Sequence, residues 1–599
     1  MNISFTKIGR FLFYIFTFLL PLFYISNSAV SIELNKTMFL LPFLSIIAIF
    51  AIIGIIKEGK FKLRNKFASF GITLFLLFTI ISTIFLSLNP LNSFFGESGS
   101  SDSLISFLIY GGLFFLPIIL MEKKEQIKNI GISLISSISI LNIGFLGKFA
   151  LGGEIYLALG SINILAIFNV IGLIMLFFLF KEEKNPSIKG LLGLSFFILL
   201  AGLILINFDI AWFILAVASF LAFWTLLLSQ NFKKHNFALL LITIISVILF
   251  LVNPTFPFEK KESVHTLGFQ ESFEIAKNSS VLGSGIASFD ENFIKYNPTM
   301  LQDTIHYESF SVIFHILNDF GILGLLLFLI PSFYLILKGF VRFLKKKQGV
   351  YEKMSFISYL SLFILLFFYS LDVVLMSLFF FFMSLFVICS EKGKEVCFKN
   401  KTPGIIFLNV AGCSLILMSI IVLNYFYILN YLSENYYGLA IENHKEDRVK
   451  AIEYLEKSNS FVEKEKTLIG LSQLYLLNAS DLYNESRLLE TKEEDREIKK
   501  EECEEFMQLS EEKAIKATEV SSQDYSTWIN LGNIYNNRRY LRDEELADKA
   551  IEAYKKAAEL APFTKDPYVA LIQVYSELGN VEKREEYVEK IRVIDPNYL

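Results

Sequence analysis

The sequence predicts an all-α protein in two parts: a polytopic helical membrane domain of about 12–13 transmembrane helices, and an α-solenoid of short helix pairs. Hydrophobic residues make up 54% of the 599 residues, and segments of about twenty apolar residues recur. This is the length at which a helix crosses a ~30 Å hydrocarbon core. Charge divides the chain, because residues 431–599 carry 24 Lys and Arg against 36 Asp and Glu, whereas residues 1–430 carry 31 against 23. We therefore predict a membrane domain over 1–430 and a second domain over 431–599.

Thirteen apolar segments are expected to span the membrane. They are residues 11–26, 37–56, 67–86, 104–121, 129–146, 161–180, 190–206, 210–228, 237–252, 309–337, 354–370, 373–390 and 404–430. With a cytoplasmic N-terminus, the inner segments hold 24 Lys and Arg, and the short outer loops hold only Lys36 and Lys148. Because cytoplasmic loops are rich in Lys and Arg, we expect a plasma-membrane protein whose loop 253–308 and C-terminal domain are extracytoplasmic.

The first apolar segment has a second interpretation. Lys7 and Arg10 precede it and the small residues SNSAVS follow it, which is also typical of a cleaved signal peptide. We favour a retained span, because the topology closes when this segment is kept.

The C-terminal domain carries a repeat pattern. The run WINLGNIY at 528–535 has the W-x-x-L-G-x-x-Y spacing of a tetratricopeptide repeat, and Pro562 and Pro596 are one 34-residue period apart. Weaker helical pairs around 437–455 and 467–475 predict about two more units. Stacked repeats form a concave surface, which favours binding of a protein partner or an acceptor over a merely solvated cap. The acidic balance argues against nucleic acid.

A polar segment, HYESFSVIFHILNDFGILG at 306–324, leads into the tenth apolar span. Ionisable groups at the mouth of a membrane span indicate a functional site. Glu308 and His306 are the candidate catalytic residues. The alternatives are a helix-start acid favoured by the helix dipole and a solitary interfacial histidine. His315 lies on the same helix face as Glu308, two turns deeper, where it relays a proton or is a satisfied buried histidine.

Other polar residues of the outer side have structural and functional interpretations. Gly283 and Gly285 in the GSG run predict a tight turn with a backbone contact to substrate, although the Walker and Rossmann spacings are absent. Asp209 and Asp372 lie in very short outer turns, where each caps the next helix or faces the outer cavity.

Four residues of the polar segment have packing as their first interpretation: Asn318, Asp319, Gly321 and Gly324. The two polar residues pack against neighbouring helices or line the cavity, and the glycines permit close helix contact. No Cys or His cluster has metal-ligand spacing, so no metal and no cofactor are expected.

The order of these features resembles a known family. The loop element GSGIASF, the polar segment running into GILG, and the runs SLNPLNSFFG and YLALGSINILAIFNVIGLIMLF are similar to the O-antigen ligase/Wzy polymerase group of membrane glycosyltransferases. The resemblance covers about residues 1–400. It implies metal-independent transfer or polymerisation of an undecaprenyl-diphosphate-linked glycan at the outer face of the plasma membrane. The acceptor is a glycan, a lipid or a protein, and membrane lipids surround the site.

The chain departs from this family at two points. Phe310 occupies the register of the family histidine, and no arginine lies between Arg64 and Arg342. Glu308 is then the first choice for the base. The diphosphate charge falls to lysines, which bind phosphate as point charges: Lys148, Lys277 and Lys295.

These departures also favour an alternative, a catalytically inactive envelope scaffold that uses the repeats for protein–protein interaction. A transporter is disfavoured, because the polar residues gather toward the outer face while the middles of the spans are Phe, Leu and Ile. Ligase and polymerase activities look alike at this level.

Overall fold

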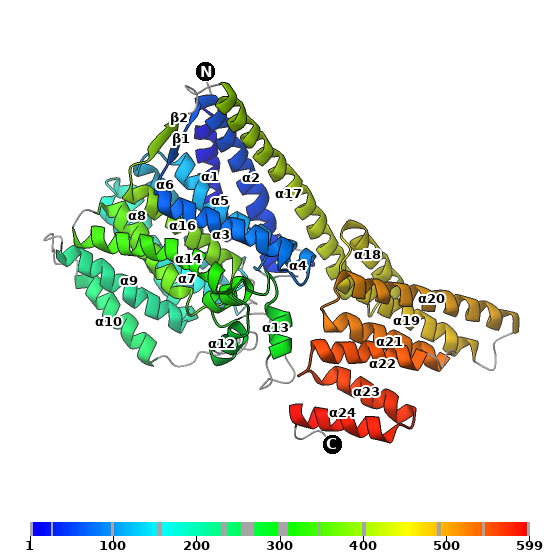
Figure 1. Ribbon diagram of the computed structural model, residues 1–599. Coiled ribbons are helices and arrows are strands. Elements are labelled where there is room, and N and C mark those ends of the chain that lie inside the picture. The colour runs from blue at the N-terminus through cyan, green and yellow to red at the C-terminus, as the bar shows by residue number, and fades with distance from the viewer. Residues whose placement is uncertain are drawn as a thin grey trace.

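The computed structural model describes most of the chain as α-helix (Figure 1). The described residues are 4–25, 28–96, 101–152, 158–228, 237–252, 269–296, 309–345, 348–397, 403–487, 493–541 and 546–595. Their only strands form one antiparallel pair, β1 (Lys60–Leu63) with β2 (Lys394–Cys397). The all-α prediction is confirmed at this level.

The helices before residue 403 form the N-terminal part. They are α1 (Phe5–Leu22), α2 (Ile32–Glu58), α3 (Lys66–Phe85), α4 (Pro90–Phe95), α5 (Leu104–Leu120), α6 (Glu125–Ala150), α7 (Ile162–Glu182), α8 (Pro186–Ile206), α9 (Asp209–Leu228), α10 (Phe237–Val252), α12 (Phe269–Lys277), α13 (Phe289–Tyr296), α14 (Val312–Leu344), α15 (Val350–Leu365) and α16 (Val373–Ser390). Each of the thirteen expected spans coincides with a helix, the last with α17 (Pro403–Asn443).

Nine of the described helices are long and apolar enough to cross a membrane, by length and composition. Shorter apolar helices accompany them at Leu104–Leu120, Asp209–Trp224 and Leu239–Val252. The centre of the N-terminal part is α16, all of whose residues are buried. It packs between α5 and α15. Aromatic side chains fill this centre, as in the edge-on contact of Phe107 with Phe320 at 5.2 Å between ring centroids.

The two ends of the N-terminal part differ in chemistry. At one end lie the β1–β2 pair and the basic loops, where Arg64 Nη2 donates to Met121 O (2.8 Å) and Arg10 pairs with Glu122 (2.8 Å). Four of the segments expected to be cytoplasmic are thus found together: the N-terminal segment and residues 57–66, 121–128 and 391–397. Helices α4, α12 and α13 lie at the opposite end (Figure 1).

The C-terminal helix stack comprises the chain from residue 431 onward. Its helices after α17 are α18 (Arg448–Phe461), α19 (Glu465–Ser486), α20 (Glu493–Val520), α21 (Tyr525–Leu541), α22 (Leu546–Leu560), α23 (Lys565–Glu577) and α24 (Val581–Ile594). Consecutive helices pack as pairs, α17 with α18, α19 with α20, α21 with α22 and α23 with α24. Gly532 of the WINLGNIY run shows why a small residue stands there, because a Cβ would lie 2.5 Å from the Tyr554 ring.

The boundary expected at residue 430 falls inside a helix. α17 runs without interruption from the apolar segment into the first helix pair of the stack (Figure 1). No proline interrupts it between 424 and 443, so the backbone has no reason to leave the helical conformation there. The stack is therefore joined to the N-terminal part by a helix and not by a loop.

Candidate functional site

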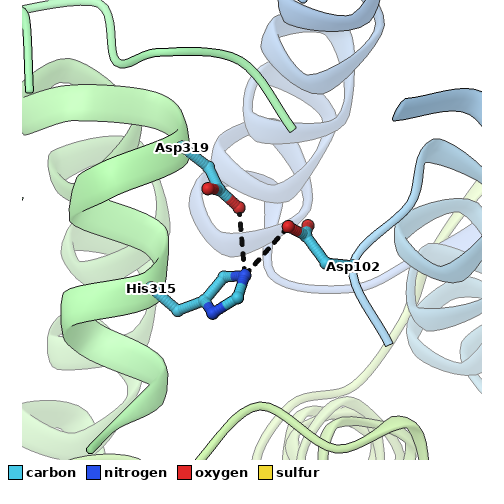
Figure 2. Close-up of side chains that lie close together, drawn as sticks. All are labelled: Asp102, His315 and Asp319. Carbon is cyan, nitrogen blue, oxygen red and sulfur yellow. Dashed lines mark hydrogen bonds and ion pairs between the residues drawn. The ribbon is translucent and has the colours of Figure 1, made fainter. Parts of the chain in front are cut away.

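Three ionisable side chains meet in the interior near the end that carries α4, α12 and α13. Asp102, His315 and Asp319, here called the Asp–His–Asp cluster, are 3%, 5% and 0% exposed. His315 Nε2 lies 2.9 Å from Asp102 Oδ2 and 3.3 Å from Asp319 Oδ2. Figure 2 shows both carboxylates pointing at the same imidazole nitrogen. Among the described residues, it is the one group of three or more His, Cys, Asp or Glu side chains whose potential metal-ligand atoms all lie within 4.8 Å of one another.

Two helix starts place the cluster. Ser103 caps α5 by accepting from Ser106 N (3.0 Å), which leaves Asp102 immediately before the helix. Ser311 caps α14 by accepting from Phe314 N (3.3 Å), so that His315 lies in the second turn. Asp319 follows four residues later, on the same helix face as His315. Serine at these N-cap positions satisfies backbone donors that a helix start leaves open.

A second layer of polar residues holds the carboxylates. Asn318 Nδ2 donates to Asp319 Oδ1 (2.9 Å), and Asn292 Nδ2 donates to Asn318 Oδ1 (2.9 Å). Ala287 N donates to Asp102 Oδ2 (2.8 Å) from a backbone with φ 55°, a conformation that non-glycine residues rarely adopt. Rigid donors aimed at a carboxylate fix its position.

The glycine turn, residues 280–285, enters a break in α14. Gly321 interrupts this helix with φ 62° and ψ −169°. The break frees the carbonyls of Asn318 and Asp319, which accept from Ser284 N and Gly285 N, both at 3.0 Å. Irregular backbone inside an apolar helix requires such substitute partners. The glycine turn therefore belongs to the same site as the cluster.

Gly283 and Gly285 are required by this close approach. They have φ 88° and 99°, and a Cβ on Gly283 would lie 2.1 Å from Asp319 O. The prediction of a tight turn is confirmed, and the turn packs against protein backbone. Gly321 was expected to allow close helix contact, but it serves the break that receives the glycine turn.

The cluster has the electrostatics of a buried charged group. Burial opposes ionisation of Asp102, but the neighbouring imidazole of His315 outweighs it and holds the pKa of this carboxyl below its usual value. Phe289 covers the imidazole, with ring centroids 5.3 Å apart and planes within 17°. The result is an enclosed site of carboxylate and imidazole groups, suited to holding a cation or a proton.

The structure brings only some of the predicted site residues together. His315, Gly283 and Gly285 lie at the site. Glu308 and His306, the predicted catalytic residues, are outside the described residues. The chain resumes directly after them at Ser309, which is buried, and Phe310 N donates to Ser272 Oγ (2.7 Å).

The predicted phosphate-binding lysines lie on the surface. Lys148, Lys277 and Lys295 are exposed, each in the last turn of its own helix. Lys277 pairs with Glu274 at 3.3 Å, and Lys295 lies 5.2 Å from the centroid of the Tyr296 ring. The buried cluster contains none of them.

Asp372 and Asp209, the two aspartates of the short turns, lie at helix starts. Asp372 caps α16 by accepting from Val374 N (2.7 Å) and Leu375 N (2.8 Å), which confirms the capping interpretation. Asp209 is the first residue of α9 and is half-buried. It is not a member of the cluster.

Sequence reasoning missed Asp102, and it expected Asp319 only to pack against neighbouring helices or to line the cavity. Asp102 is 213 residues from His315, so no local spacing connects them. One signal was present: an aspartate directly before an apolar helix is expected at the mouth of a membrane span, where an ionisable group is costly.

Helix α4 connects the site with the C-terminal helix stack. Ser93 Oγ donates to Ile286 O next to the glycine turn (2.5 Å). On its other side, Asn92 Nδ2 donates to Glu465 Oε1 (3.4 Å) and Asn89 Nδ2 to Ser521 Oγ (3.2 Å). Both Glu465 and Ser521 belong to the stack, so the stack lies against the same end of the N-terminal part as the site.

Comparisons with known proteins add little. No protein-family model and no curated protein matches the chain. Among solved structures the chain is similar to the crystal structure of the yeast Tom70, at 12% sequence identity over 87% of this chain and 94% of that chain. The TM-score is 0.17, and a similarity this low carries no argument.

Proposed function

We propose that this chain transfers or polymerises a polyprenyl-diphosphate-linked glycan at the outer face of the plasma membrane. One observation carries the proposal: segments distant in sequence that bear the family resemblance are joined at one place. The run SLNPLNSFFG contributes Ser93, which donates to Ile286 O, and GSGIASF contributes Gly285, which donates to Asp319 O in the polar segment. Two segments that carry the resemblance, 193 residues apart in sequence at Ser93 and Ile286, thus contact each other at one site.

The reaction needs two kinds of group. The acceptor hydroxyl oxygen attacks the anomeric carbon, and a new glycosidic bond forms as the bond from that carbon to the diphosphate oxygen breaks. The hydroxyl proton passes to a base. We assign this role to Glu308, which directly precedes the buried residue Ser309. The polyprenyl diphosphate leaves with its electron pair, and positive charge must stabilise it.

The C-terminal helix stack has a role in this proposal. We interpret the stack as tetratricopeptide-like repeats that bind the acceptor or a partner protein. Its contacts with α4 through Glu465 and Ser521 hold it beside the site. An acceptor bound there would be presented at the outer face, which raises its effective concentration.

The test is glycan transfer in reconstituted membranes supplied with a native lipid-linked donor pool. Glu308→Gln is expected to lower transfer about 10²–10⁴-fold, because general bases contribute that much, and His306→Ala is its companion. Glu274→Gln is the control, since it removes an exposed carboxylate from the same outer loop. Loss in Glu308→Gln with normal expression supports the proposal. Absence of transfer by the wild-type chain across a broad donor set would instead favour the inactive scaffold.

A further inference from the structure

We propose that the Asp–His–Asp cluster binds one divalent metal ion. Asp102, His315 and Asp319 each offer one ligating atom, and these atoms lie within 4.8 Å of one another. Carboxylate oxygens and imidazole nitrogens bind Zn²⁺ at about 2.0–2.2 Å, so two ligands of a tetrahedral ion stand roughly 3.3–3.5 Å apart. The distance from His315 Nε2 to Asp319 Oδ2, 3.3 Å, already matches this separation. The distance from His315 Nε2 to Asp102 Oδ2 is 2.9 Å, and a small side-chain movement would lengthen it to the same value.

A second observation also points to a bound cation. Asp319 is fully buried, and its Oδ1 accepts from Asn318, whereas its Oδ2 has only the longer 3.3 Å contact with His315 Nε2. Figure 2 shows that the same nitrogen also faces Asp102 Oδ2, which lies closer at 2.9 Å. One N–H cannot serve both carboxylates fully, and a poorly satisfied buried carboxylate oxygen is costly. A metal ion at the centre of the cluster would satisfy it.

Charge balance is compatible with such an ion. As metal ligands, the two carboxylates and the neutral imidazole together carry a charge of −2. No described lysine or arginine forms an ion pair with Asp319. One divalent cation makes the set neutral, and buried charges otherwise require pairing or protons. Carboxylate ligands suit Mn²⁺ and an imidazole suits Zn²⁺, so these are the two ions to use as probes.

The role of the ion follows from the proposed function, although the binding site itself does not depend on it. A diphosphate leaving group needs positive charge, yet no arginine lies between Arg64 and Arg342 and the candidate lysines are exposed. Two buried carboxylates alone would repel the donor. A metal ion with three protein ligands keeps open positions for phosphate oxygens, so it would supply the charge that the missing arginines do not. In this respect the chain would depart from the metal-independent transfer that the family resemblance implies.

The test measures metal on the purified full-length chain in detergent, carrying an affinity tag without histidine. The protein is stripped with EDTA, loaded with Mn²⁺ or Zn²⁺, desalted and examined by elemental analysis. The wild type is expected to retain about one ion per chain, and His315→Ala and Asp319→Asn to bind at least about tenfold more weakly. Asp372→Asn is the control, because it alters another buried carboxylate that caps α16.

If a variant does not fold, the proposal is tested on the wild type alone, by comparing its melting temperature with and without the ion. Binding to the folded state alone must raise the melting temperature. Wild type that retains no ion and shows no shift would overturn the proposal, as would Asp319→Asn that binds like the wild type. The metal measurement is independent of glycan transfer. An ion bound by a chain without transfer activity would therefore contradict the proposed function and leave the metal site standing.

Discussion

Glu434→Gln is expected to destabilise the contact between α17 and the start of α19 by about 3–5 kcal/mol. Glu434 Oε1 lies 2.6 Å from Lys464 Nζ, and Oε2 lies 2.7 Å from Lys466 Nζ. The side chains of Glu434 and Lys464 are 5% and 2% exposed. Removing the carboxylate leaves the Lys464 ammonium buried without an opposite charge. Breaking one side of a buried pair costs more than the intact pair contributes, because the remaining charge is not solvated.

The same substitution should change the pH dependence of stability. Burial lowers the pKa of the Lys464 ammonium from 10.5 even with Glu434 beside it, and loss of the carboxylate lowers it further. A folded-state pKa below the unfolded value means that the unfolded chain binds more protons, so stability rises with pH in that interval. The variant should therefore regain stability relative to the wild type as the pH rises toward 10.5.

Hydrogen exchange of α18 and α19 measures this effect locally, because it reports the free energy of opening of each segment. Glu453→Gln is the matched control. Its partner Lys457 lies one helical turn away, and both side chains are about half exposed or more. Such surface pairs contribute about 0.3–0.5 kcal/mol. Equal exchange in the two variants would contradict a buried ion pair at Glu434.

Much of the helical architecture could be predicted because it depends on local pattern. Thirteen apolar segments of suitable length coincide with thirteen helices, since burying the backbone polar groups of such segments requires helical hydrogen bonds. The continuity of α17 was not predicted. After residue 430 the helix becomes more acidic and packs against the C-terminal helix stack, but a change in charge alone does not end a helix.

Of the Asp–His–Asp cluster, only His315 was predicted as a site residue. His315 and Asp319 are one turn apart, and the polar segment around them identified the right helix. The partner that defines their chemistry, Asp102, precedes α5 and is 213 residues away from His315 in the sequence. Gly321 shows the same limit, because a glycine in an apolar helix signals close packing. Only the position of the glycine turn shows that the helix breaks there.

Gly283→Ala is expected to displace the glycine turn from the break in α14. A Cβ at this position would lie 2.1 Å from Asp319 O, and φ is 88°. The left-handed conformation alone costs a non-glycine residue about 1–2 kcal/mol. The clash adds to this cost because it involves backbone, which cannot rotate away as a side chain would. The hydrogen bonds from Ser284 N and Gly285 N to the broken helix are then lost.

Limited proteolysis of residues 269–296 and thermal melting of the full-length chain in detergent measure the displacement. Gly283→Ala should give faster cleavage near residue 283 and a lower melting temperature. Gly144→Ala is the control: it lies within helix α6, a Cβ meets nothing within 4 Å, and alanine is the better helix former by up to about 1 kcal/mol. Wild-type melting in Gly283→Ala would mean that the turn does not enter the break.

The metal measurement links this prediction to the chemistry of the site. The glycine turn holds the Asp319 carbonyl, and Ala287, two residues beyond the turn, holds Asp102. Displacing the turn should therefore loosen both carboxylates of the Asp–His–Asp cluster without removing either one. Weaker Mn²⁺ binding by Gly283→Ala, at unchanged ligand composition, would show that the glycine turn positions the cluster. Full binding by a chain whose loop is already cleaved would show that α5 and α14 suffice.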